Sequence, residues 1–245
     1  GECWNYPEEW LEVMDGVLNM HLRSIILELV QGRLAPPFAA RLVERMIEDA
    51  GYEGILRSHL VLDNHDLPRL GTTVPDMDKR FLARVAQMTL PGCPVIYYGS
   101  ELGMKGGADP TNRGPMRWDL VSEENEEYQA LRRLIALRQE NPARTVGDFR
   151  VLDSENLFAF LCYTDRARES IVVVISPSAQ EVKDMVPVRD SRLMDSGPLE
   201  CLLSSDKTPV HCGMLELTIP PFEARIFRTA DRGVNRGYSM LKRVP

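Results

Sequence analysis

The hydrophobic pattern of the chain changes near residue 146, and this change constrains the fold more than any other feature. Up to about residue 143, short apolar runs alternate with longer amphipathic segments. Such alternation predicts a parallel sheet with crossover helices. From 147 to 229 only short apolar runs remain, which predicts a small antiparallel β-sandwich. We therefore expect an α/β domain at 1–146, a β-sandwich domain at 147–229 and a loose tail at 230–245.

The individual elements follow from periodicity and turn residues. In the first part we expect short strands at 15–20, 58–62 and 94–98 and helices at 39–50, 78–90 and 122–140. In the second part we expect strands at 157–163, 170–175, 213–219 and 224–228. Gly51 is suited to end the helix at 39–50, and the strand at 94–98 (PVIYY) is expected to be buried.

Charge and composition exclude some functions. The 245 residues include 29 Lys and Arg against 36 Asp and Glu, so the acidic balance argues against a nucleic-acid partner. No apolar stretch approaches the ~18 residues of a membrane span. The five cysteines are scattered and odd in number, which favours free thiols in a reducing compartment. A cytoplasmic protein with no membrane partner is expected.

The densest polar cluster directly follows a predicted strand, at residues 61–66 (VLDNHD). Two carboxylates, an amide and an imidazole within four residues suit metal binding, sugar positioning or acid–base chemistry. They equally suit a polar cap on a strand. A metal-dependent enzyme using Asp63, His65 and Asp66 is one interpretation, but no second histidine cluster supplies further ligands. The remaining histidines are isolated and are interpreted as structural: His21, His59 and His211.

Five segments resemble the α-amylase family of glycoside hydrolases. Residues 61–66 resemble the last of its four short signatures, and residues 91–104 (PGCPVIYYGSELGM) resemble its eighth barrel strand. Residues 109–119 (DPTNRGPMRWD) resemble the following loop, residues 1–4 (GECW) the signature ending the fifth strand, and residues 220–228 the closing strand of its β domain. The nearest group is that of neopullulanases, cyclomaltodextrinases and oligosaccharide α-glucosidases. The resemblance implies the second half of a (β/α)8 TIM barrel followed by a β-sandwich.

The resemblance also implies site residues for cleavage of α-glucosidic bonds in starch-like oligosaccharides. Glu2 matches the general acid/base, and Asp66 matches the carboxylate that holds the sugar hydroxyls and supports the transition state. His65 matches the imidazole donor in the same subsite, with Asn64 beside it as a further substrate-binding residue. Trp4 is expected either to stack on a leaving-side sugar or to belong to the core.

Three further residues come from the same comparison. Asp109 and Arg113 match a pair near the next sugar or a loop-locking ion pair. Arg69 is a substrate-binding candidate that is more easily interpreted as ordering its loop. No cofactor is expected, and calcium binding cannot be judged from this chain because many of the family's calcium ligands lie upstream.

The resemblance leaves one catalytic group without a match. A retaining glycosidase needs an acid and a nucleophile about 5–5.5 Å apart, and the family's nucleophile lies on the fourth strand, upstream of Gly1. The expected function is therefore a retaining glycoside hydrolase, or a transglycosylase, present as a fragment that is inactive and folds poorly without the missing half of the barrel. The β-sandwich, with its own core, is expected to stay folded. The alternative is a non-catalytic binding protein with an amylase-like body.

Overall fold

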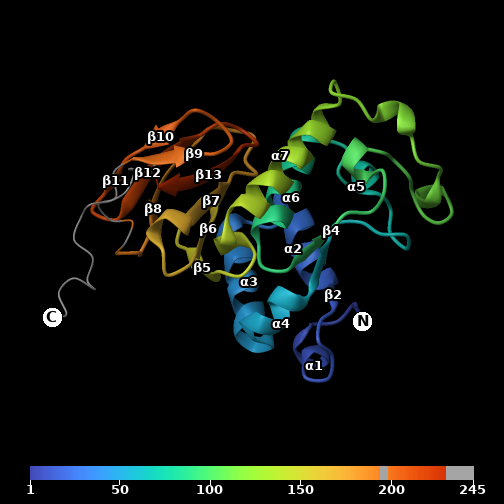
Figure 1. Ribbon diagram of the computed structural model, residues 1–245, viewed down its shortest axis with the longest axis horizontal. Coiled ribbons are helices and arrows are strands. Elements are labelled where there is room, and N and C mark those ends of the chain that lie inside the picture. The colour runs from blue at the N-terminus through green and yellow to red at the C-terminus, as the bar shows by residue number, and fades with distance from the viewer. Residues whose placement is uncertain (192, 194–197, 230–245) are drawn as a thin grey trace.

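The computed structural model describes residues 1–191, 193 and 198–229. A small parallel sheet, a layer of helices and an antiparallel part lie side by side (Figure 1). The expected tail at 230–245 lies outside the described residues. None of the helices in the described part of the chain is long and apolar enough to span a membrane, and all five cysteines are free thiols.

The parallel sheet has four short strands in chain order. They are β1 (Glu2–Cys3), β2 (Leu18–Asn19), β3 (His59–Val61) and β4 (Cys93–Val95). The register sets Glu2 opposite Leu18, Leu18 opposite His59, and His59 opposite Cys93. Since neighbouring strands are parallel, their carboxyl ends meet at one edge of the sheet.

The helices begin and end where local chemistry allows. They are α1 (Glu8–Leu11), α2 (Met20–Val30), α3 (Pro36–Ala50), α4 (Tyr52–Arg57), α5 (Leu70–Thr73), α6 (Met77–Thr89) and α7 (Glu126–Glu140). Asp76 caps α6 by accepting from Lys79 N, and Asn125 caps α7 by accepting from Tyr128 N, as side-chain oxygens at N-caps do. Gly51, with φ of 76°, follows α3 in a conformation that favours glycine.

The structure corrects the expected strand at 15–20. Only Leu18 and Asn19 are extended, because the Asn19 side chain accepts from Leu22 N at 2.9 Å and starts helix α2. This helix was not predicted from the sequence. Its buried residues lie on nearly all sides, so it lacks the one-sided apolar pattern that marks a surface helix: Met20, Leu22, Ile25, Ile26, Leu27, Leu29 and Val30.

The structure also corrects the expectation of a buried strand at 94–98. Strand β4 covers Cys93–Val95, with Cys93 exposed and Pro94 and Val95 half-buried. The side chain of Tyr98 is 40% exposed. The physical reason is position, since β4 ends the sheet and pairs only with β3 in the described chain. The apolar residues of this segment therefore have a neighbouring strand on one side only.

The antiparallel part contains the four expected strands and five more. One sheet has the order β10-β9-β13-β7-β6-β5 and the other the order β11-β12-β8. The strands of the first sheet are β5 (Asp148–Leu152), β6 (Phe158–Tyr163), β7 (Ile171–Ile175), β9 (Leu199–Cys201), β10 (Lys207–Thr208) and β13 (Ala224–Thr229). Those of the second are β8 (Val182–Pro187), β11 (Val210–His211) and β12 (Met214–Ile219).

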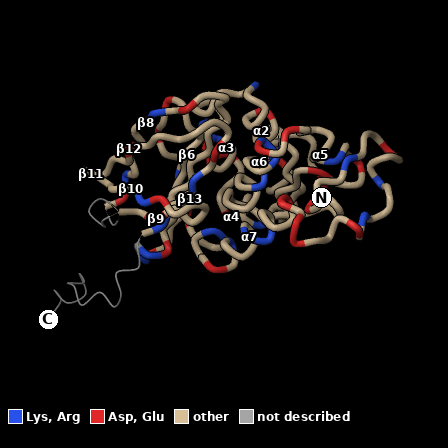
Figure 2. The backbone as a smooth tube through the Cα atoms, turned by 90° about the horizontal axis from the view of Figure 1, so that it is seen from above, with Lys and Arg blue, Asp and Glu red and all other residues tan. Residues whose placement is uncertain are grey.

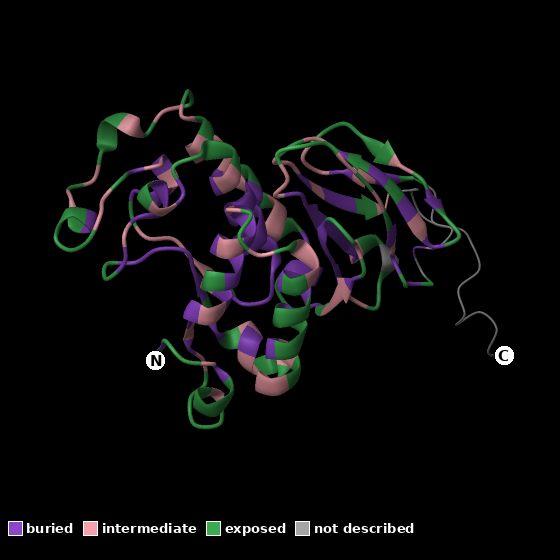
Figure 3. Cartoon of the chain, turned by 180° about the vertical axis from the view of Figure 1, so that it is seen from behind, coloured by how far each residue is buried: buried purple, intermediate pink, exposed green. Residues whose placement is uncertain are grey.

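The six-stranded sheet packs on both faces, and its residues alternate between two cores. In β6, Phe158, Phe160 and Cys162 join the core formed with the helices α2, α3, α6 and α7. Ala159 and Leu161, which point to the opposite face, join the core between the two antiparallel sheets. Buried segments occur both in the helix layer and in the sheets (Figure 3).

Candidate functional site

The loop after β3 is built on a buried carboxylate. Asp63 is 0% exposed, and its Oδ2 accepts from Leu70 N and from Ser100 Oγ, both at 2.7 Å. The bond to Leu70 draws the loop back on itself at the start of α5. Within the loop, Asn64 Oδ1 accepts from Asp66 N at 3.0 Å, a local turn typical of asparagine. These bonds leave His65 and Asp66 at the surface.

Four charged or ionisable residues meet on this exposed side and form what we call the Asp66 cluster: His65, Asp66, Asp109 and Arg113. Arg113 Nη2 lies 3.3 Å from Asp66 Oδ1 and 3.2 Å from Asp109 Oδ2. His65 Nε2 lies 3.2 Å from Asp66 Oδ2. Since the side chains are about half exposed, the ion pairs contribute little stability. Their main effect is to hold Asp66 in one orientation.

The backbone of the same two loops is tied together beneath the cluster. Arg113 Nε donates to the carbonyl of His65 at 3.0 Å. Asn112, whose side chain is fully buried, donates from Nδ2 to the carbonyls of His65 and Leu67 at 2.7 and 3.0 Å. The loop after β4 is thereby locked onto the loop after β3. Acidic and basic residues both occur in the chain around α5, where these loops lie (Figure 2).

Arg69 lies in the interior, not at the surface. Its side chain is 0% exposed, lies over the rings of Tyr97 and Tyr98 at 4.6 Å from each centroid, and donates to the carbonyl of Tyr98. Its backbone N–H donates to Gly106 O at 2.9 Å. Of the two expected roles of Arg69, ordering its loop agrees with this burial, and substrate binding stays a prediction. A guanidinium that lies over two adjacent rings is held by cation–π attraction.

The expected role of Asn64 in substrate binding stays a prediction. This residue is buried, and its Oδ1 is used by the turn to Asp66. The side chain therefore shapes the loop that carries its neighbours, and its Nδ2 has no hydrogen-bond partner in the described chain.

Glu2 and Trp4 lie apart from the Asp66 cluster. Glu2 is exposed on β1, two strands away from β3. In the described part of the chain, no hydrogen bond or ion pair joins Glu2 to the cluster. Trp4 is 62% exposed, so the alternative that it belongs to the core is wrong for this chain. Glu2 is the first residue of β1, and Trp4 directly follows its last residue.

The metal interpretation of Asp63, His65 and Asp66 fails on geometry. Asp63 is buried and bonded to Leu70 and Ser100, whereas His65 and Asp66 face solvent. Across residues 1–191, 193 and 198–229, no group of three or more His, Cys, Asp and Glu side chains is arranged to hold a metal ion.

Two residues that shape the site were not found by sequence reasoning. Ser100 contacts the Asp63 carboxylate, and Asn112 locks the loops. Both lie within segments singled out for their resemblance, at 91–104 and 109–119. Ser100 lies two residues after the predicted strand at 94–98, and this position was the available signal for it. The burial of Asn112 has no local signal in the sequence.

Comparisons with known proteins agree on one family. Residues 35–152 match the family model described as the alpha amylase catalytic domain. A cyclomaltodextrinase of Geobacillus thermopakistaniensis (strain MAS1) is 31% identical over 91% of this chain and 38% of its own length. Neopullulanase 2 of Thermoactinomyces vulgaris is 31% identical over 92% of this chain and 39% of its own length. The chain thus spans about two-fifths of these curated relatives.

Solved structures share the fold. The structure of Ttha1563 from Thermus thermophilus superposes with a TM-score of 0.80 at 26% identity, over 94% of this chain and 52% of that one. The native form of the Nostoc punctiforme debranching enzyme gives a TM-score of 0.81 at 24% identity, over 94% of this chain and 51% of that one. The helix layer and the antiparallel sheets both fall within the matched length.

Proposed function

We propose that this chain, which matches the alpha amylase catalytic domain over residues 35–152, is the carboxyl-terminal part of a retaining glycoside hydrolase of the α-amylase family that cleaves α-glucosidic bonds of starch-like oligosaccharides. The observation that carries the proposal is the Asp66 cluster at the carboxyl end of β3. It presents a carboxylate and an imidazole at the edge of a parallel sheet, where the sites of such sheets are found.

We propose that the parallel sheet is an arc of a (β/α)8 barrel. Strands β1 to β4 follow chain order, and β1 and β4 each pair with one neighbour only in the described chain. Beside β4, a surface pocket of about 400 Å³ is lined by apolar groups of Ile96, Tyr98, Leu131 and Ile135. The other half of a barrel would pair both edges and cover this pocket. Curated relatives that are more than twice as long support this interpretation.

The proposed roles follow the two-carboxylate chemistry of retaining enzymes. Glu2 donates a proton to the glycosidic oxygen as the bond breaks and later takes a proton from the attacking water. Asp66 and His65 hold hydroxyls of the reacting sugar while positive charge develops on its ring. The exposed indole of Trp4 offers a flat surface to a leaving-side sugar. Asp109 and Arg113 orient Asp66 and border the next sugar.

The nucleophile is proposed to come from the part of the barrel that precedes β1. Asp63 does not substitute for it, because its carboxylate is buried and bonded to Leu70 and Ser100. Attack by this nucleophile on the sugar would form a covalent glycosyl-enzyme intermediate. Attack of water on that intermediate gives hydrolysis, and attack of a sugar hydroxyl gives transglycosylation. The substrate class proposed for both reactions is a maltooligosaccharide.

The test uses the longer protein that contains this chain, with Glu2→Gln as the main variant. We expect kcat on maltooligosaccharides to fall roughly 10²- to 10⁴-fold, because general acid catalysis is lost. The loss should be smaller on an aryl glycoside whose leaving group needs little protonation. Glu9→Gln, which removes another exposed carboxylate of the same segment, is the matched control and should leave kcat unchanged. Equal losses on both substrates would remove Glu2 from the acid role.

Asp66→Asn tests the second carboxylate. We expect kcat to fall by more than KM rises, because contacts to the sugar hydroxyls strengthen in the transition state. The fold should survive, since the side chain is 42% exposed. An effect on KM alone would make Asp66 a ground-state binding residue.

A further inference from the structure

The loop that carries His65 and Asp66 depends on one buried carboxylate. Asp63 closes this loop by accepting from Leu70 N, and its second partner is the hydroxyl of Ser100, directly after the turn that follows β4. The place of Asp63 therefore sets the path of the loop from β3 to α5.

The Ser100 hydroxyl has a fixed direction. Arg84 of α6 donates from Nη2 to Ser100 Oγ at 2.6 Å and to the carbonyl of Ser100 at 3.1 Å. A hydroxyl has one proton and two lone pairs. Because Arg84 occupies a lone pair, the proton is free to point at Asp63 Oδ2, 2.7 Å away. The three residues form a chain of hydrogen bonds from α6 to the loop.

Arg84 is itself held, through Gln87, by strands β3 and β4. Its Nη1 donates to Gln87 Oε1 at 2.8 Å, and Gln87 Nε2 donates to the carbonyls of Leu60 and Val95 at 3.0 and 2.9 Å. Burial lowers the pKa of Arg84 below its ordinary value, and the charge of Asp63 opposes that shift. The guanidinium is thus a positive charge near the buried carboxylate, and Arg23 is another.

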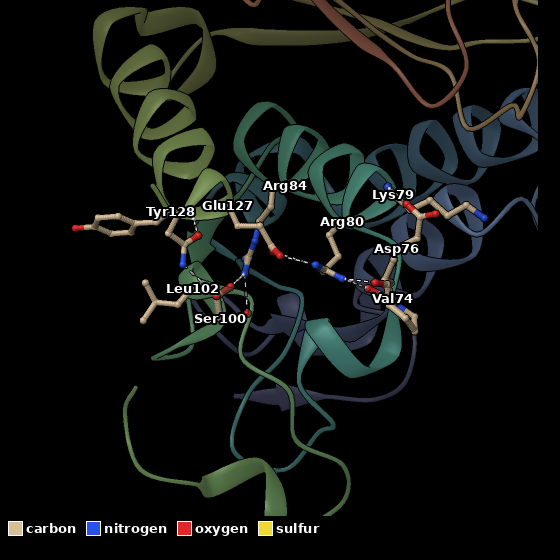
Figure 4. Close-up of polar contacts among 11 residues, drawn as sticks. Val74, Asp76, Lys79, Arg80, Arg84, Ser100, Leu102, Glu127 and Tyr128 are labelled. Carbon is tan, nitrogen blue, oxygen red and sulfur yellow. Dashed lines mark hydrogen bonds and ion pairs between the residues drawn. The ribbon is translucent and has the colours of Figure 1, made fainter. Parts of the chain in front are cut away.

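An ion pair between α6 and α7 supports the same part of the molecule (Figure 4). Arg80 of α6 donates from Nε to Glu127 Oε2 of α7 at 3.0 Å, and from Nη1 to the carbonyls of Val74 and Pro75 at 2.9 and 2.7 Å. Gly103, with φ of 72°, packs so closely on Glu127 that a Cβ would lie 2.5 Å from its Oε1. Helices α6 and α7 and the turn at 100–103 therefore form one rigid support behind the loop.

We propose that Ser100 and Arg84 are positioning residues, which hold Asp63 and through it the loop that presents His65 and Asp66 to the sugar. This inference rests on the proposed function. Ser100 and Arg84 are 4% and 6% exposed, so neither reaches substrate. Their contribution is to keep Asp66 within the small tolerance that the reaction geometry allows.

The test is Ser100→Ala in the longer protein, compared with Ser58→Ala as a matched control. Ser58 is buried and directly precedes β3. Its Oγ accepts from Val17 N at 3.2 Å and donates to Gly54 O at 2.7 Å. We expect Ser100→Ala to lower kcat on maltooligosaccharides roughly 10- to 100-fold with little change in KM. Ser58→Ala should leave kcat near that of the unmodified protein.

Hydrogen exchange supplies a readout that needs no activity. In peptides covering residues 63–72, Ser100→Ala should speed exchange, because the amide of Leu70 loses a fixed acceptor, and Ser58→Ala should not. An unmodified protein without glycosidase activity would refute the proposed function, and the exchange result would still decide the positioning role.

A conservative variant separates lost positioning from general damage. Ser100→Thr keeps the hydroxyl, and a cavity of about 190 Å³ that Ser100 lines together with Arg84 and Leu131 has room for the added methyl group. We expect this variant to restore both kcat and slow exchange. Unchanged kcat in an active protein, or the same exchange in the two alanine variants, would overturn the proposal.

Discussion

The parallel and antiparallel parts of this chain bury their strands to very different extents. Every residue of β7, from Ile171 to Ile175, is fully buried, because β6 and β13 pair with it and both faces of its sheet are covered. Strand β4 begins the apolar run that ends at Tyr98, yet its residues are exposed or half-buried. An apolar run predicts a strand, but the neighbours decide whether that strand is buried.

The two parts are nevertheless not independent. The helices of the first part cover one face of the six-stranded sheet, so Phe158 and Phe160 of β6 and Val173 of β7 share a core with α2 and α6. Our sequence-based expectation that the β-sandwich has its own core holds for one face only, the face toward the three-stranded sheet. The open strand edges belong to the parallel sheet of the first part. Because the two parts share a core, loss of structure in the first part is expected to lower the stability of the second.

The largest effect is expected for the chain when it is produced without the proposed remainder of the barrel. In the described residues, β1 and β4 each pair with one neighbouring strand only, and the unpaired edges of such strands pair with other chains. We expect the isolated chain to self-associate and to show no glycosidase activity. Size-exclusion chromatography with light scattering and an assay on maltooligosaccharides check this.

Adding the separately produced amino-terminal half should restore a monodisperse complex, and activity with it. A monomeric isolated chain that unfolds cooperatively and hydrolyses maltooligosaccharides by itself would contradict both the barrel interpretation and an upstream nucleophile.

The next largest effect is expected for substitutions on the two faces of β6. Phe160→Ala, on the face toward the helices, should lower the free energy of unfolding by ~3–5 kcal/mol, and Leu161→Ala, on the other face, by ~2–5 kcal/mol. Both side chains are 0% exposed. Urea unfolding of the longer protein, followed by hydrogen exchange in α6 and in β12, distinguishes them. Phe160→Ala should speed exchange in α6 and Leu161→Ala in β12, and identical exchange patterns would show that the two cores act as one.

The smallest effect concerns a thiol between the two parts. Burial raises the pKa of Cys162 to about 12 from 9.0, and the nearby Arg144 and Arg138 oppose the shift. Between pH 9 and pH 12 the Cys162 thiol keeps its proton in the folded chain and loses it in the unfolded chain. Its contribution to the free energy of unfolding is therefore fully present below pH 9 and decreases as the pH rises above 9. The expected slope is about 1.4 kcal/mol per pH unit.

Urea unfolding at pH 8, 9 and 10 measures this slope, and Cys162→Ala should flatten it. The window stops at pH 10 because burial lowers the pKa of Arg144 to about 10, and loss of its proton changes stability with the opposite sign at higher pH. Equal slopes in the two proteins between pH 9 and 10 would show that Cys162 is not the group responsible.

The sequence by itself determined the features that depend on neighbours along the chain. Alternating apolar and amphipathic segments separated the parallel from the antiparallel part, and Gly51 marked the end of α3. The polar run at 63–66 marked the end of a strand, where parallel sheets carry their sites. These features are local because a side chain's spacing along a helix or strand fixes the face on which it lies.

The tertiary structure decided which of those residues meet, and which are buried. The burial of Arg69 over two adjacent tyrosine rings, and the exposure of Arg113, which contacts Asp66 at the surface, are not written in the local sequence. The bonds from Ser100 to Asp63 and from Arg113 to Asp66 span 37 and 47 residues. Such contacts depend on how strands pair and helices pack, and local spacing carries no record of either.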